Sequence, residues 1–123
     1  MILLDTSVLI ASLTNPRPLA ANLYERIQRR ERILMPAICL YEWLRGPRRP
    51  EELQIQEDLF PARLALPYGP DEAHVSARLY RGLPRARGRE IDIAIAACAI
   101  CHDARLWTIN RKDFADIPGL QLV

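Results

Sequence analysis

Short apolar runs alternate with longer amphipathic segments along the chain, and this alternation predicts the fold class. Strands are predicted at five apolar runs and helices at six longer segments. The predicted strands are Ile2–Leu4, Ile33–Met35, Leu64–Leu66, Leu106–Ile109 and Leu120–Val123. The first predicted helix begins near Val8. The other five cover Pro18–Arg32, Ala37–Arg45, Glu51–Leu59, Asp71–Tyr80 and Glu90–His102. Strands that alternate with helices indicate an α/β protein, a three-layer α/β/α sandwich around a mainly parallel sheet of four to five strands.

The composition is that of one compact domain, expected over residues 1–123, with no repeat or linker. Half of the residues are hydrophobic, which is enough for one core without covalent staples. No apolar segment reaches the roughly 20 residues that a membrane span needs. The start of the chain carries no signal-peptide pattern, and three cysteines cannot all pair. We therefore expect a cytoplasmic protein with no membrane contact.

Acidic residues interrupt or follow the apolar runs at four places. Asp5 ends the first predicted strand, Glu42 lies within the apolar helix at 37–45, Asp92 lies within the helix at 90–102, and Asp113 follows the strand at 106–109. A buried carboxylate without a partner is costly, and a shared cation is the simplest common partner. In parallel sheets, ligands bind beyond the carboxyl ends of the strands. One crevice there could receive all four acids, which suggests a metal site.

Each acid also has a local explanation. Asp5 could cap the helix that follows it, and Glu42 could pair with Arg45 one turn later. Asp92 falls in a first helical turn, where the helix dipole favours an anion. Asp113 could be the N-cap of a short last turn. The coincidence of all four is what favours the metal interpretation.

In this order, the motifs resemble those of the PIN domain family, in particular small bacterial toxins of the VapC or FitB type. They are Ile2-Leu3-Leu4-Asp5-Thr6-Ser7, Tyr41-Glu42, Ile91-Asp92-Ile93-Ala94-Ile95-Ala96-Ala97, Thr108-Ile109-Asn110-Arg111-Lys112-Asp113-Phe114 and Ile117-Pro118-Gly119-Leu120. Together they cover essentially the whole chain.

The resemblance implies a Mg²⁺- or Mn²⁺-dependent endoribonuclease that hydrolyses phosphodiester bonds with metal-activated water, as the toxin of a type II toxin–antitoxin pair. It also implies a VapB-like antitoxin, an RNA substrate and a homodimer. By position, Asp5, Glu42 and Asp92 match the family's metal-binding acids, and these three and Asp113 are the candidate catalytic residues. The fourth family position falls at Asn110 or Asp113, of which Asp113 is the better ligand. The resemblance assigns supporting hydrogen bonds to Thr6, Ser7 and Thr108, and Asn110 is predicted to be a supporting residue with them.

Arginines adjoin the acid-bearing segments and are the candidate RNA contacts. Sixteen of the seventeen basic residues are arginine, the better residue for bidentate phosphate contacts. We expect Arg45, Arg85, Arg87 and Arg89 to bind RNA, although a solvated basic surface or antitoxin contact explains the clusters equally well. Tyr41 and Trp43 could stack on bases or belong to the core or a dimer interface.

Four other interpretations can be drawn from the sequence. A non-catalytic PIN-like module could bind RNA or a partner without turnover. Cys98-Ala99-Ile100-Cys101-His102 matches the haem attachment pattern, but it falls in a predicted buried helix. A redox pair or zinc site at the same cysteines is disfavoured by helical geometry. A phosphoacceptor receiver domain would want paired acids after the first strand, where this chain has Asp5 alone.

Overall fold

A parallel four-stranded sheet forms the centre of the computed structural model, which describes residues 1–123. The strand order is β2-β1-β3-β4, and every neighbouring pair is parallel. The strands are β1 (Ile2–Leu4), β2 (Ile33–Leu34), β3 (Arg105–Trp107) and β4 (Gln121–Leu122). The predicted fold class, a mainly parallel sheet of four to five strands between helices, is confirmed.

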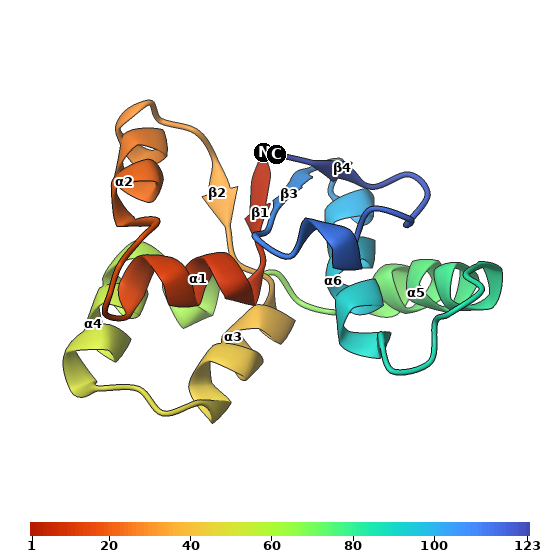
Figure 1. Ribbon diagram of the computed structural model, residues 1–123, viewed down its shortest axis with the longest axis horizontal. Coiled ribbons are helices and arrows are strands. Elements are labelled where there is room, and N and C mark those ends of the chain that lie inside the picture. The colour runs from red at the N-terminus through yellow and green to blue at the C-terminus, as the bar shows by residue number, and fades with distance from the viewer.

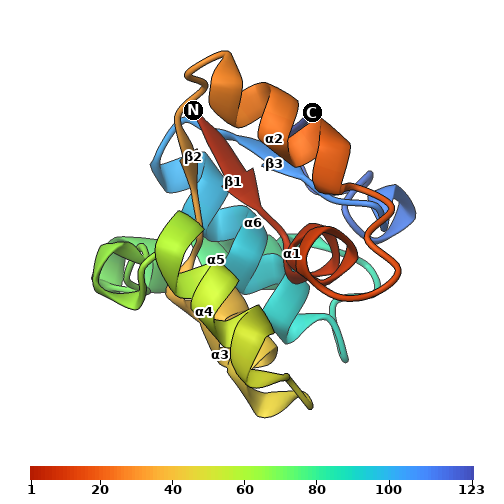
Figure 2. The same ribbon diagram turned by 90° about the vertical axis from the view of Figure 1, so that its left-hand side faces the viewer.

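Six α-helices and two short 3₁₀ helices surround the sheet. The α-helices are α1 (Thr6–Leu13), α2 (Ala20–Gln28), α3 (Ala37–Arg45), α4 (Pro50–Leu59), α5 (Pro70–Gly82) and α6 (Glu90–Cys101). The 3₁₀ helices are η1 (Ala62–Leu64) and η2 (Arg111–Asp113). In Figure 2, α2 lies on one side of the sheet and α6 on the other, with α5 packed behind α6. None of the helices has the length and apolar character that crossing a membrane would require.

The prediction of a strand at Leu64–Leu66 is wrong. Residues 62–64 form η1, and only Leu66 makes a single bridge, to Pro36. Leu66 accepts a hydrogen bond from the Ala37 amide and donates one to the Met35 carbonyl. Proline cannot donate to a strand ladder, so Pro36 on one side and Pro67 after Leu66 limit the pairing to one residue.

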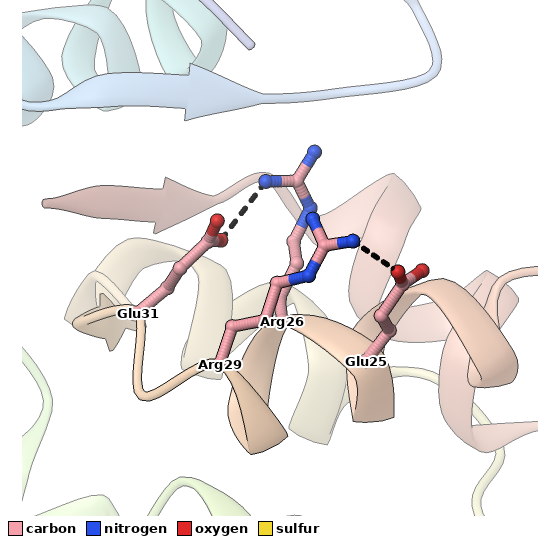
Figure 3. Close-up of polar contacts among 4 residues, drawn as sticks. All are labelled: Glu25, Arg26, Arg29 and Glu31. Atoms are coloured by element: carbon pink, nitrogen blue, oxygen red, sulfur yellow. Dashed lines mark hydrogen bonds and ion pairs between the residues drawn. The ribbon is translucent and has the colours of Figure 1, made fainter.

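The helix predicted over Pro18–Arg32 is shorter than expected, because a left-handed turn ends it. Arg30 has φ +59°, its amide bonds to the Ile27 carbonyl, and the Glu31 amide bonds to the Arg26 carbonyl. This is the Schellman arrangement that satisfies the last carbonyls of a helix. Figure 3 shows two ion pairs at this end, Arg26 with Glu31 at 2.9 Å and Arg29 with Glu25 at 2.5 Å. The Arg26 guanidinium also lies 4.8 Å from the centre of the Trp107 ring and so ties α2 to the sheet.

The core joins β1, the inner face of α1 and the whole middle of α6. Leu3, Leu4 and Leu9 are fully buried, and residues 93–99 of α6 are buried without interruption. Phe114, with 2% of its surface exposed, anchors the segment after η2 in the same core. This packing fixes the ends of β1 and β3 relative to the start of α6.

Replacing Phe114 by alanine is expected to lower the free energy of unfolding by about 3 to 5 kcal/mol, because it removes a fully buried aromatic ring. Ile109 is 55% exposed in the same loop region, so Ile109→Ala is the matched control and should change stability by less than about 0.5 kcal/mol. Urea unfolding followed by circular dichroism measures both. Equal effects of the two substitutions would show that Phe114 does not anchor this segment.

Candidate metal centre

Asp5 lies at the carboxyl end of β1 and is held by two hydroxyl groups. Its side chain is buried, with 5% of the residue exposed. Ser7 Oγ donates to Asp5 Oδ2 at 2.6 Å, and Thr108 Oγ1 donates to the same oxygen at 2.7 Å. Asp5 occupies the N-cap position of α1, but its side chain makes no capping hydrogen bond. The explanation of Asp5 as a helix cap is therefore wrong for its side chain, and the carboxylate is fixed across β1 and β3 instead.

Glu42 projects from α3 toward the first turn of α1. Thr6 Oγ1 donates to Glu42 Oε1 at 2.6 Å, and Arg45 Nη2 lies 3.3 Å from Glu42 Oε2. The local pairing with Arg45 thus exists, although it is a single contact to an arginine side chain that is 54% exposed. The hydroxyl of Thr6, the residue after Asp5, therefore fixes one oxygen of Glu42.

Asp92 lies in the first turn of α6, as predicted, and its pKa reports on the other acids. Burial, the largest cause, and the negative charges of Asp5, Asp113 and Glu42 together raise this pKa from 3.8 to about 6. Arg89 acts in the opposite sense. Four acids that are far apart in sequence therefore lie within electrostatic range of one another. In Figure 1 the end of β1, the start of α1, the start of α6 and η2 gather in one region beside the sheet.

Asn110 and Asp113 flank η2, the short helix after β3. Asn110 is the N-cap residue, and its amide donates to Thr108 Oγ1 at 3.0 Å. The prediction that Asp113 could be an N-cap is therefore wrong, because Asp113 is the last residue of η2. The Asp113 side chain is exposed, and its backbone carbonyl accepts a hydrogen bond from Arg89 Nη2 at 2.8 Å.

The four acids are of the ligand type that a hard divalent cation prefers, but their side chains are not arranged as a coordination shell. Carboxylate oxygens are the ligands that Mg²⁺ and Mn²⁺ prefer. As the side chains stand, no three His, Cys, Asp or Glu residues are placed so that they could hold an ion together. Both oxygens of Glu42 are engaged, by Thr6 and Arg45. Binding of a shared ion at this centre therefore requires side-chain rotation, above all of Glu42 away from Arg45.

The candidate RNA-binding arginines divide into engaged and free groups. Arg45 contacts Glu42 and lies 5.2 Å from the centre of the Tyr41 ring. Arg89 forms a bidentate ion pair with Asp116, at 2.9 Å and 2.6 Å. Arg85 and Arg87 are exposed and form no ion pair. Asp116, the partner of Arg89, was not identified from the sequence.

The two aromatic candidates on α3 have different surroundings. Trp43 is fully buried and belongs to the core, with the Arg48 guanidinium 4.2 Å from the centre of its ring. Tyr41 is 56% exposed and is therefore available to a base or a partner.

The two histidines, Cys98 and Cys101 lie away from the acids. Cys39 instead lies beside them: its Sγ donates to the Leu4 carbonyl at 3.3 Å, and burial together with the charges of Asp5 and Glu42 raises its pKa. His74 Nδ1 is 2.8 Å from the Pro70 carbonyl within α5, and His102 Nε2, just after α6, is 3.6 Å from Glu72 Oε1 of α5. Cys98 is fully buried in α6, where burial raises its pKa to about 12. A haem could reach this thiol only if the core opened, which argues against the attachment pattern.

Comparisons with known proteins agree with this architecture. A model of the PIN domain family matches residues 2–120. The chain is 34% identical to the ribonuclease VapC19 of Mycobacterium tuberculosis over 124 aligned positions, which cover 98% of each protein. It also resembles the DNA-bound VapBC complex of Salmonella typhimurium, with a TM-score of 0.79, 25% identity, and coverage of 99% of this chain and 96% of that one. A toxin–antitoxin complex from Klebsiella pneumoniae gives a TM-score of 0.73 at 26% identity, covering 98% and 95% of the two chains.

The family match over nearly the whole chain and the full-length relative lead to the same assignment. The chain belongs to the PIN domain family and, within it, to the VapC type.

Proposed function

We propose that this protein is a divalent-metal-dependent endoribonuclease and the toxin of a type II toxin–antitoxin pair. The raised pKa of Asp92 is the observation that most strongly supports it, because the charges of three other acids contribute to that rise. Four carboxylates brought together against their mutual repulsion form a site that favours a cation. The names of the VapC ribonuclease relatives support RNA as the substrate.

Within this proposal, Asp5, Glu42, Asp92 and Asp113 hold the ion, either Mg²⁺ or Mn²⁺. A bound divalent cation supplies charge neutralisation at the scissile phosphate and a more acidic water. The hydroxyls of Ser7 and Thr108 orient Asp5, and that of Thr6 orients Glu42. Asn110 supports the loop through its backbone bond to Thr108 and is not itself assigned as a ligand. The histidines lie elsewhere, so no histidine is assigned as a general base. The protein's own contribution is to orient the carboxylates and to exclude water from Asp5.

The antitoxin is proposed to cover the exposed apolar surface between α3 and α4. Leu44 and Tyr41 are 53% and 56% exposed, and Leu40, Leu44 and Leu53 line a groove there. Exposed apolar grooves of this kind are suited to an amphipathic helix of a partner. The structural relatives, solved as toxin–antitoxin complexes, support a partner of this class, and a homodimer is part of the same proposal.

A second candidate is a member of the family that binds RNA or a partner without cleaving it. It is favoured by the engagement of both Glu42 oxygens and by the lack of a ready three-carboxylate cluster. The two candidates differ in whether purified protein cleaves RNA when Mn²⁺ is present and stops when EDTA is added.

Asp5→Asn is expected to reduce Mn²⁺-dependent RNA cleavage by at least about a hundredfold, because it removes a charged ligand from the centre. A fluorogenic RNA in Mn²⁺ buffer, with EDTA as the blank, measures the rate. Asp103→Asn is the matched control, because Asp103 is exposed, follows the far end of α6, and has φ +50°, which asparagine adopts readily. Normal cleavage by the Asp5 variant would refute the assignment of the centre.

The raised pKa of Asp92 predicts a pH-dependent effect on stability in metal-free solution. The folded pKa of about 6 lies above the ordinary value of 3.8, so ionisation of Asp92 destabilises the folded state as the pH rises from about 4 to about 6. Asp92→Asn removes this cost. The variant should gain melting temperature over the unmodified protein through that range, and the gain should level off above it. Thermal unfolding in EDTA at several pH values measures the difference, and a gain that is independent of pH would contradict the prediction.

Arg85→Ala combined with Arg87→Ala is expected to weaken RNA binding and to lower the steepness of its salt dependence by about 1 to 1.5, as expected for two lost phosphate contacts to single-stranded RNA. Fluorescence anisotropy at several salt concentrations, with Mg²⁺ replaced by Ca²⁺, gives the slope. Arg32→Ala with Arg105→Ala is the control pair, since both arginines are exposed at the amino end of the sheet. Equal losses in both pairs would indicate a diffuse basic surface instead of a defined contact.

A further inference from the structure

Arg89 joins the two segments that carry Asp92 and Asp113. It is the N-cap residue of α6, three positions before Asp92, and its carbonyl accepts the Ile93 amide at 2.9 Å. Its side chain crosses to the segment after η2. There, Nη1 donates to Asp116 Oδ2 at 2.9 Å, while Nη2 donates to Asp116 Oδ1 at 2.6 Å and to the Asp113 carbonyl at 2.8 Å. One guanidinium thus makes three hydrogen bonds to a segment 24 to 27 residues away in sequence.

These contacts make Arg89 unsuitable as the phosphate contact that its place in the sequence suggested. Both of its terminal nitrogens are engaged by protein oxygens, and the side chain is only 21% exposed. The Asp116 carboxylate neutralises the positive charge of Arg89, which a phosphate contact would need, and it raises the pKa of Arg89. In return, Arg89 lowers the pKa of Asp116.

The segment held by Arg89 has few other polar attachments. Phe114 and Ile117 anchor its apolar side in the core, and the Asn110 amide bonds to Thr108. Two side-chain hydrogen bonds tie η2 to the rest of the fold: Arg89 Nη2 to the Asp113 carbonyl at 2.8 Å and Arg111 Nη1 to the Val123 carbonyl at 2.5 Å, and of these only the first leads to the start of α6. The planar fork of arginine fixes both oxygens of Asp116 and the Asp113 carbonyl together, which a lysine ammonium cannot reproduce.

We propose that Arg89 and Asp116 form a clamp that positions Asp113 relative to Asp92. Arg89 and Asp116 are therefore positioning residues of the metal centre, and neither is a ligand nor an RNA contact. This inference rests on the proposed function, because the positions of Asp92 and Asp113 relative to each other matter only if the two acids bind the same ion. The clamp depends on the planar shape of the Arg89 guanidinium as well as on its charge.

The test measures Mn²⁺ affinity by titration calorimetry on the full chain and its variants Arg89→Lys, Asp116→Asn and the double variant. Each single substitution should weaken Mn²⁺ binding by about tenfold, the usual scale for residues that orient metal ligands. The double variant should be no weaker than either single variant, because both remove the same clamp. Arg29→Lys is the control, since Arg29 also forms an ion pair, with Glu25, but on the exposed surface of α2 (Figure 3).

Two further measurements separate positioning from other roles. Amide hydrogen exchange should accelerate at Asp113 and Phe114 in Arg89→Lys and stay unchanged in the buried middle of α6, because only the clamped segment is released. RNA cleavage by Arg89→Lys should recover at saturating Mn²⁺, whereas the KM for RNA should stay as in the unmodified protein.

The outcomes are distinguishable. If Arg89→Lys binds Mn²⁺ as tightly as the unmodified protein, the clamp does not position the acids, and the inference is overturned. A raised KM for RNA with unchanged Mn²⁺ affinity would likewise overturn it, in favour of a phosphate contact. If the unmodified protein itself takes up no Mn²⁺, the proposed function fails, and the positioning role fails with it. Faster exchange in Arg89→Lys would still show, in that case, that the clamp orders the segment.

Discussion

Mutual repulsion among four carboxylates is the constraint on which this structure depends. Asp5, Glu42, Asp92 and Asp113 come from four separate elements, and left to themselves their charges would drive those elements apart. The apolar core opposes that repulsion. β1, α1 and the buried length of α6 pack as one unit, so the chain cannot relax by separating the acids without exposing core side chains. The raised pKa of Asp92 reflects this arrangement: burial contributes most to the rise, and the charges of Asp5, Asp113 and Glu42 add to it.

The helices and strands were predicted well where the apolar pattern agrees with residues that begin or end a helix, such as proline and glycine. The helix at Ala37–Arg45 has the predicted bounds, since Pro36 precedes it and Gly46-Pro47 follows it. The prediction failed at Leu64–Leu66, where three apolar residues resemble a strand but flanking prolines restrict pairing. The end of α2 was missed because a left-handed arginine gives no sequence signal of the kind that glycine gives.

The candidate centre was partly predictable for a different reason. An acid inside an apolar run is visible in sequence, so all four acids could be named, and the structure places them in electrostatic range. Their partners could not be derived from the pattern. That Thr6 serves Glu42, while Ser7 and Thr108 share one oxygen of Asp5, depends on the relative rotation of α1, α3 and β3. The pairing of Arg89 with Asp116 joins residues 27 positions apart, and no local spacing rule reaches that far.

The two arginines nearest the acids differ in a way that bears on how the centre could work. Arg45 meets Glu42 through one long contact and is largely exposed, so that pair contributes little and separates easily. Arg89 meets Asp116 through two short bonds and the Asp113 carbonyl through a third, so it is the more firmly fixed of the two. The backbone at Asp113 is therefore tied firmly to the start of α6, whereas Glu42 keeps one oxygen on Thr6 and holds Arg45 only loosely. If the four acids share a divalent cation, Asp92 and Asp113 would offer it carboxylates on segments joined by Arg89, and Glu42 would have to exchange its weak contact with Arg45 for the ion.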